Sequence, residues 1–238
     1  MRPMRTYLAV GAAVMLPLVL PAQAPFEGTL IMKLHMNGGS EQNMKVEIKG
    51  DRQVTIMSLP ADAGPMAGME MRAIYDQKAR TVTTLLPVPS MMAQMPALAN
   101  AKGIKNVADL SGLEADSLHD DATIKKLGTS EKVAGIDCDD YEITSGKEAP
   151  MRACIVSTLG RFLYPRSTGG MGRRSSPPAW VRAFGNRPVF PVKVWSTDGK
   201  GVAMEVTSVQ RGSVPESEFQ VPEGYVDMSA LMRGRGGL

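Results

Sequence analysis

Apolar and polar residues alternate with a period of two along much of this chain. Near its start, Leu30, Met32 and Leu34 occupy every second position, and Lys33 and His35 alternate with them. Because successive side chains of a strand point to opposite faces, this pattern predicts strands with one buried side and one side facing water. Alternation of this kind is typical of an antiparallel sheet and excludes a chain that is mainly helical.

The same pattern recurs along the chain. Residues 44–48 place Met44, Val46 and Ile48 on one side, and we expect Val54 and Ile56 to continue that apolar side after a turn at Gly-Asp. Further strands are expected at residues 73–75, 81–86, 136–144, 151–158, 190–195 and 202–209. Helical patterning is scarce and is confined to residues 90–102, 107–118 and 179–184.

These elements predict a mainly β fold with about nine to eleven strands and two or three short helices. Two or three short helices are too few to cover one apolar face of so large a sheet. We therefore expect a curved antiparallel sheet, a half-barrel, with the helices as a lid. We place it in one β-rich domain at residues 23–238, with a flexible Gly/Arg/Pro-rich loop near 165–178 and a flexible C-terminal tail near 229–238.

The first segment has the composition of a secretory signal peptide. Arg2 and Arg5 precede an apolar run at residues 7–20 that ends in Pro and small residues. The run is shorter than the ~20 residues that a membrane-spanning helix needs. We expect cleavage after Ala22 and a periplasmic or secreted protein with no lipid anchor, since no Cys lies near the cleavage site.

Export makes the only two cysteines informative. In an oxidising compartment Cys138 and Cys154 are expected to form a disulfide. A hairpin that turns at residues 145–147 places the two cysteines directly opposite each other on neighbouring strands. Redox catalysis is the alternative, but catalytic pairs are usually C-x-x-C and this spacing is far wider.

Several short motifs resemble a known family. K-L-G-T-S-E-K-V-A-G-I-D-C-D-D-Y-E-I at residues 126–143 resembles the central motif of an exported bacterial family, domain of unknown function 4412. F-E-G-T-L-I-M-K near the start, E-I-K-G-D-R, I-Y-D-Q-K-A-R-T and F-Q-V-P-E-G-Y near the end extend the likeness over about residues 26–226. Members look similar to the periplasmic lipoprotein-carrier fold, so the resemblance implies a curved antiparallel sheet partly closed around helices.

Methionine is unusually frequent, with 18 residues in the chain. Two clusters stand out, M-A-G-M-E-M at residues 66–71 and M-M-A-Q-M at residues 91–95. Flexible, polarizable thioethers suit an adaptable apolar binding surface, and we take Met66, Met69, Met91, Met92 and Met95 as candidate ligand-binding residues. The alternatives are a copper(I)-handling site, because Cu(I) prefers sulfur ligands, and ordinary core methionines.

The charges are segregated along the chain. Residues 109–142 hold ten acids and three Lys, whereas residues 161–187 hold six Arg and no acid. Arg173 and Arg174 lie in the Gly/Ser/Pro-rich part of the basic segment and are our candidates for holding an anionic lipid headgroup. An ordinary solvated loop, or one that folds back on the acidic half, is the alternative.

The sequence shows no catalytic motif. G-x-S-x-G is absent, and His35 and His119 have no identifiable nucleophile nearby. Asp139 and Asp140 are expected to point to opposite faces of a strand, which prevents a shared acid/base site. We therefore expect no enzyme, no metal, no cofactor and, because aromatic residues are few in the basic segment, no nucleic-acid partner.

Together these features predict an exported, monomeric, non-enzymatic protein that binds a hydrophobic or amphiphilic ligand, a lipid or an acylated partner, in the cell envelope. No membrane span is expected after the signal peptide is cleaved. The competing interpretations are a copper(I)-handling protein that uses its Met clusters and a structural or interaction module of the envelope with no ligand.

Overall fold

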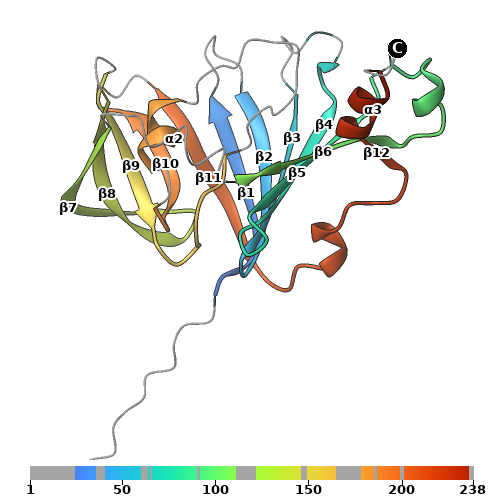
Figure 1. Ribbon diagram of the computed structural model, residues 1–238. Helices are drawn as coiled ribbons and strands as arrows, with labels where there is room; N and C mark the ends of the chain where they lie inside the picture. Colours follow the sequence, from blue (N-terminus) through green and yellow to red (C-terminus); the bar gives the residue numbers. More distant parts are fainter. Residues whose placement is uncertain are drawn as a thin grey trace, which may run out of the picture.

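The computed structural model describes residues 25–35, 41–59, 64, 66–89, 92–110, 122–145, 149–164, 178–184, 187–198 and 201–235. In this part of the chain, twelve strands form one mostly antiparallel sheet with only short helices (Figure 1). The strands are β1 (Glu27–His35), β2 (Glu41–Lys49), β3 (Arg52–Ser58), β4 (Glu70–Asp76), β5 (Thr81–Pro87), β6 (Gly103–Asp109), β7 (Thr123–Val133), β8 (Ile136–Thr144), β9 (Met151–Val156), β10 (Phe190–Ser196), β11 (Val202–Arg211) and β12 (Tyr225–Asp227). The helical segments are η2 (Pro96–Leu98), α2 (Ala179–Phe184), η3 (Glu216–Phe219) and α3 (Met228–Arg235).

The first strand, β1, lies in the middle of the sheet between β2 and β11. The strand order is β12-β6-β5-β4-β3-β2-β1-β11-β10-β9-β8-β7, so β1 to β6 run to one edge and β7 to β11 return from the other edge to pair with β1. Both halves are meanders of antiparallel neighbours, which short connections can join. At one edge β12 pairs with β6 in parallel.

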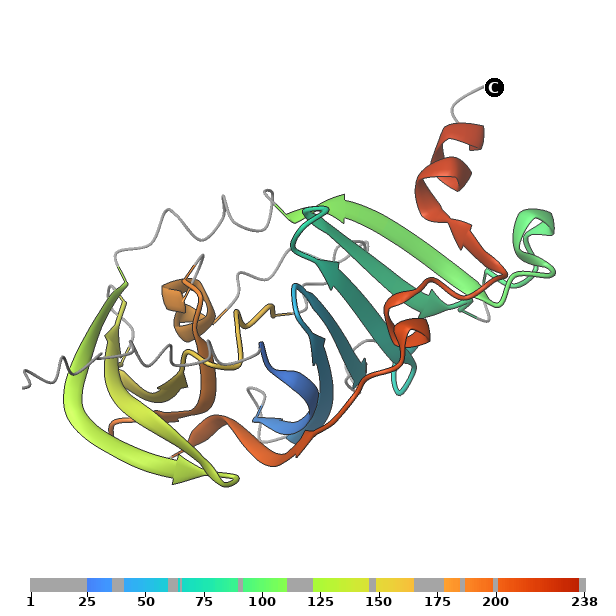
Figure 2. The same ribbon diagram turned by 90° about the horizontal axis from the view of Figure 1, so that it is seen from below.

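The sheet is open and is not strongly curled (Figure 2), so the predicted half-barrel is wrong in its closure. The prediction assumed that short helices alone could not cover an apolar face. The two faces are instead covered by short segments of the chain, which combine irregular stretches with α2 and η3. Residues 159–164 and α2 lie on one face, and the segment between β11 and β12 lies on the other. The strand count, twelve, is slightly above the predicted range.

We call the face that carries Leu30, Met32 and Leu34 the core face and the opposite face the back face. The register pairs Val46 with Thr55, so Val54 and Ile56 lie on the back face, and the expectation that they continue the apolar side of β2 is wrong. A one-residue change of register moves every side chain to the other face, which is why turn length decides this point.

The back face of β3 to β5 is covered by residues 212–224, which we call the C-terminal strap (Figure 2). Val214 and Phe219 of the strap form an apolar cluster with Val54, Ile74 and Leu85. The strap leads into β12, whose Tyr225 lies against Gly103; a Cβ atom at that glycine would lie 2.4 Å from the Tyr225 ring. Only glycine leaves room there for the Tyr225 ring and for the Leu86 carbonyl oxygen, which would lie 2.5 Å from the same Cβ atom.

Ion pairs hold the strap on the sheet. Glu216 lies 3.0 Å from the Lys49 ammonium and 2.7 Å from the Arg52 guanidinium. Its hydrogen bond with Arg52, followed by that with Lys49, lowers its pKa to about 2. The hydrogen bond from Arg72 likewise lowers the pKa of Glu218. The strap is therefore anchored by charge as well as by its apolar residues.

The predicted disulfide between Cys138 and Cys154 is present, with a Cα–Cα distance of 5.4 Å. The predicted register is two residues in error, because Cys154 is paired with Asp140 and the bond joins diagonal neighbours. The hairpin turn is longer than assumed: Ile143 pairs with Met151, so the connection occupies more residues than 145–147.

The predicted helix at 179–184 is confirmed as α2. Among the described residues of the segment 90–102, which begin at Met92, only η2 is helical. The expected helix at 107–118 is wrong at its start, because Gly103–Asp109 form β6; Leu110 is helical, and residues 111–118 lie outside the described residues. The segment expected as a C-terminal tail contains α3. The predicted signal peptide at 1–22 and residues 165–177 of the predicted loop lie outside the described residues.

Candidate binding face

A row of four methionines crosses the core face. Met32, Met44, Met57 and Met71 lie directly opposite one another on β1, β2, β3 and β4. They are 0%, 0%, 8% and 4% exposed. Cross-strand neighbours have Cβ atoms about 4.5–5.5 Å apart, so the four side chains form one continuous strip. We call this strip the methionine row.

Two further rows complete the core face of β1 to β6. The first runs from Leu30 through Val46, Thr55, Ala73 and Thr84 to Asn106, and the second runs from Ile48 through Gln53, Tyr75 and Val82 to Ala108. None of the residues in the three rows carries a charge. This follows from strict alternation, which places the Lys, Arg, Asp and Glu residues of these strands on the back face.

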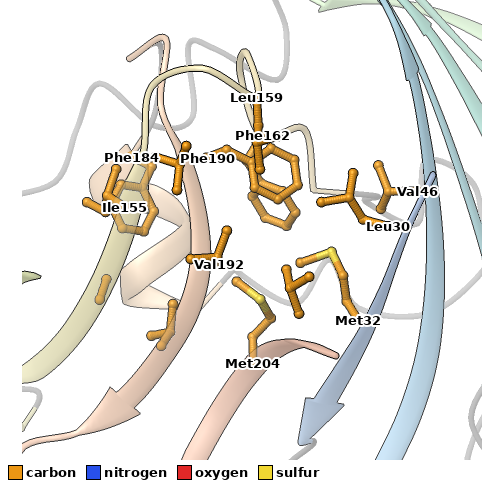
Figure 3. Packing of buried hydrophobic residues seen from close by; sticks show 14 of the residues in the cluster. Leu30, Met32, Val46, Ile155, Leu159, Phe162, Phe184, Phe190, Val192 and Met204 are labelled. Atoms are coloured by element: carbon orange, nitrogen blue, oxygen red, sulfur yellow. The ribbon is translucent and has the colours of Figure 1, made fainter. Parts of the chain in front are cut away.

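The core face is covered by residues 159–164 and α2, which we call the cover. Leu159, Phe162, Trp180 and Phe184 belong to the same buried cluster as Leu30, Met32 and Met44. Figure 3 shows Phe162 and Leu159 pointing toward Leu30, Val46 and Met32, with Val192 and Met204 completing the cluster. The cover thus fills the space over β1, β2, β10 and β11.

Aromatic rings join the two parts of the cover. The Phe162 ring centroid lies 6.0 Å from that of Trp180 and 6.3 Å from that of Tyr164. It also packs edge-on against Phe190 of β10 at 5.1 Å. Burial raises the pKa of Tyr164. Such ring pairs add to the free energy that apolar burial alone provides, so they help to keep the cover in place.

Gln53 connects the cover to the polar part of the core face. Its Nε2 donates to Thr55 Oγ1 at 3.1 Å and to the carbonyl oxygen of Leu163 at 2.9 Å. Gln53 is 2% exposed, and its Oε1 accepts no hydrogen bond from the described residues. Leu163 itself packs against Ala73 and Tyr75. The cover therefore contacts both the apolar and the polar parts of the face.

The structure places the predicted methionines beside this face and not on it. Met66 and Met69 lie half-buried in the β3–β4 connection, and Met92 and Met95 lie half-buried in the β5–β6 connection. Both connections leave the sheet at the end where Met57, Met71 and Leu86 lie, which is the end that carries the methionine row. Met91, Arg173 and Arg174 lie outside the described residues.

The methionine row and Gln53, Thr55 and Thr84 were missed by the sequence analysis. Met32 and Met44 already stood out as inward residues of alternating strands. Met71 belongs to the methionine cluster at residues 66–71, but only the register of two further hairpins shows that Met57 and Met71 lie in line with Met32 and Met44.

Asp139, Asp140 and His35 all lie in strands of the sheet, and each has a hydrogen-bond or ion-pair partner. Asp139 pairs with Lys126 at 2.6 Å, whereas Asp140 is buried and accepts a hydrogen bond from Thr129, so the two carboxylates lie on opposite faces as predicted. His35 lies on the back face beside Glu41, and His119 lies outside the described residues.

Neither a metal-ligand cluster nor a membrane-spanning helix is present in the described residues. Over those ranges, no cluster of three or more His, Cys, Asp or Glu side chains is arranged to hold a metal ion. Within the same part of the chain, none of the helices has the length and apolar character needed to cross a bilayer.

The architecture is that of a mainly β protein built on one open sheet, whose core face is uncharged over β1 to β6. The chain belongs to the family Domain of unknown function (DUF4412), whose model matches residues 26–225, and this confirms the resemblance seen in the sequence motifs. No curated protein matches the chain.

Solved structures with a similar course of the chain were also found. An uncharacterized conserved protein from Thermus thermophilus matches with a TM-score of 0.44 and 10% identity, covering 85% of this chain and 91% of that one. PNGF-II matches with a TM-score of 0.44 and 13% identity, covering 88% of this chain. The chain spans 32% of the length of that PNGF-II chain.

Proposed function

We propose that this chain is an exported, non-enzymatic binding protein of the cell envelope whose core face holds a hydrophobic or amphiphilic ligand, a lipid or an acylated partner. The observation that carries the proposal is the uncharged core face of β1 to β6, which is covered by one loop and a six-residue helix. A covering of that kind leaves the sheet intact when it moves.

The ligand would replace the cover on the core face. Phe162, Leu159 and Trp180 supply the apolar contacts that an acyl chain would supply in their place. The hydrophobic effect is proportional to the buried apolar area and does not depend on direction, so the exchange of one apolar occupant for the other is close to balanced. Under this proposal a ligand with higher affinity for the uncovered state shifts the population toward it.

The methionines would allow the core face to bind acyl chains of different shapes. Met has three rotatable bonds and a polarizable sulfur, so the methionine row can adjust to an acyl chain of variable shape. This adaptable surface would extend beyond the end of the sheet through Met66, Met69, Met92 and Met95. These residues lie in the β3–β4 and β5–β6 connections, which leave the sheet beside the methionine row. We keep Met91 as a candidate for the same site on its sequence alone. Arg173 and Arg174 are kept, also on sequence alone, as the residues that would receive an anionic headgroup, which titration with laurate tests.

The test is to purify the chain from cells that make it and to measure its mass by native mass spectrometry under gentle conditions. Added mass that disappears on organic extraction and is identified as lipid supports the proposal. Saturable binding of a fluorescent fatty acid to the lipid-free chain would support it independently. A bare mass together with no saturable binding would refute it.

A Cu(I) titration of the same sample separates the competing function. Tight binding with a fixed stoichiometry that disappears in the Met66→Leu/Met69→Leu variant would favour copper handling. Weak binding without a fixed stoichiometry leaves the lipid proposal in place.

A further inference from the structure

The polar residues of the core face are gathered on one side of it. Gln53 and Thr55 lie on β3, Tyr75 on β4, Thr84 on β5 and Asn106 on β6. They lie in the two rows next to the methionine row. In the first row Thr55, Ala73, Thr84 and Asn106 are successive cross-strand partners, and in the second row Gln53 is opposite Tyr75. We call these five residues the polar patch.

The polar patch is buried to an unusual degree. Gln53, Thr55, Tyr75 and Thr84 are 2%, 0%, 1% and 5% exposed. Polar side chains are rarely buried so completely unless hydrogen bonds satisfy them. Gln53 Oε1 accepts no hydrogen bond from the described residues, so the patch presents a buried acceptor to whatever occupies the face.

Resting on the proposed function, we propose that the ligand carries an uncharged, hydrogen-bonding headgroup, such as the glycerol ester of a monoacylglycerol, and that the polar patch receives it. A ligand hydroxyl can donate to Gln53 Oε1. When the cover moves, Gln53 Nε2 loses its Leu163 carbonyl partner and can donate to an ester carbonyl instead. The acyl chain then lies along the methionine row.

The absence of charge on these rows selects against an ionised headgroup. The rows that contain the polar patch hold Gln, Thr, Tyr, Asn and apolar residues and no Lys or Arg, so a buried phosphate or carboxylate would have no counter-charge there. Burying an unpaired charge is far more costly than burying a hydroxyl that finds a hydrogen bond. The back face, by contrast, carries Lys45, Arg52 and Arg72.

The experiment compares three amphiphiles that share a lauroyl or dodecyl chain and differ in the headgroup. Isothermal titration of the full chain is carried out with monolauroylglycerol, laurate and dodecyltrimethylammonium, each below its micelle concentration. We expect monolauroylglycerol to bind at least about tenfold more tightly than either ion. Equal or tighter binding of laurate would overturn this inference and leave the proposed function standing. Binding of none of the three would refute the proposed function itself.

Matched threonine variants test the location. Thr84→Val removes a hydroxyl from the polar patch, and Thr83→Val removes one from the back face of the same strand. We expect Thr84→Val to weaken monolauroylglycerol binding about tenfold and to leave laurate binding unchanged, and we expect Thr83→Val to change neither. Thermal melts identify a variant that fails to fold, and Thr55→Val then takes its place. A folded Thr84→Val and a folded Thr55→Val that both keep full affinity would show that the headgroup lies elsewhere.

Discussion

Phe162 provides the sharpest test of whether the cover is displaced by ligand. Its side chain is 6% exposed and packs against Phe190, Trp180 and Tyr164 with ring centroids 5.1, 6.0 and 6.3 Å away. The Phe162→Leu variant keeps an apolar side chain but loses all three ring pairs. Each pair contributes about 0.5–1.5 kcal/mol, and leucine recovers part of the contact, so we expect a loss of about 1–3 kcal/mol in the free energy of unfolding.

The same substitution is expected to tighten ligand binding. If the ligand replaces the cover, the ring pair between Phe162 and Phe190 of β10 exists only in the covered state, because the pairs with Tyr164 and Trp180 lie within the cover. Losing a pair worth about 0.5–1.5 kcal/mol lowers the cost of uncovering and corresponds to an affinity gain of roughly 2- to 13-fold, as long as the covered state remains the dominant one. A residue that belonged to a permanent core would show the opposite behaviour, because its loss would disorder the binding face.

Urea denaturation gives the free energy of unfolding, and isothermal titration with monolauroylglycerol gives the affinity. Phe219→Leu is the matched control, because Phe219 is 8% exposed, packs under Arg52 at 4.7 Å and belongs to the strap on the back face. It should lower stability and leave affinity unchanged. A Phe162→Leu protein that is less stable but binds equally well or more weakly would refute displacement of the cover.

Three further predictions concern the stability of the sheet and of the strap that covers its back face. Met44→Ala, at a position that is 0% exposed within the methionine row, should lower the free energy of unfolding by about 2–5 kcal/mol in urea denaturation; a loss well below that range would mean that the row repacks freely. The folded-state pKa of about 2 for Glu216, below its ordinary value of 4.5, means that its ion pair with Arg52 stabilises the fold above about pH 4.5 and that this contribution is lost as the pH falls toward 2. Glu216→Gln should therefore flatten the pH dependence of the melting temperature between pH 5 and 2, and an unchanged profile would show that the strap does not depend on this carboxylate. Replacing Cys138 and Cys154 together with Ser removes a cross-link across a sequence separation of 16 and should cost roughly 3 kcal/mol by the chain-entropy model, whereas unchanged stability would contradict that assignment.

The sequence predicted most of the strands correctly. Alternation located β1, β2, β8 and β11, and the predicted disulfide between the two cysteines is confirmed. The helix at 179–184 was also evident. These features depend on residues close together in the chain, where the period of the side chains is a sufficient guide.

Register and the site were not predictable in the same way. Whether Val54 lies beside Val46 or on the opposite face depends on one residue of turn length, and the diagonal position of the disulfide depends on two. The methionine row exists only because three successive hairpins bring Met32, Met44, Met57 and Met71 into line. Local pattern carries no information about such alignments, because each is set by how distant strands pack.

The sequence by itself determined that this chain forms a mainly β protein, because alternation fixes which side chains can share a face. Only the tertiary structure decided that the sheet stays open, because two short segments, the cover and the C-terminal strap, bury its faces from opposite sides. Apart from α2, whose helical pattern the sequence shows, these segments have no clear periodicity, so the residues that cover the sheet become visible only once the chain is folded.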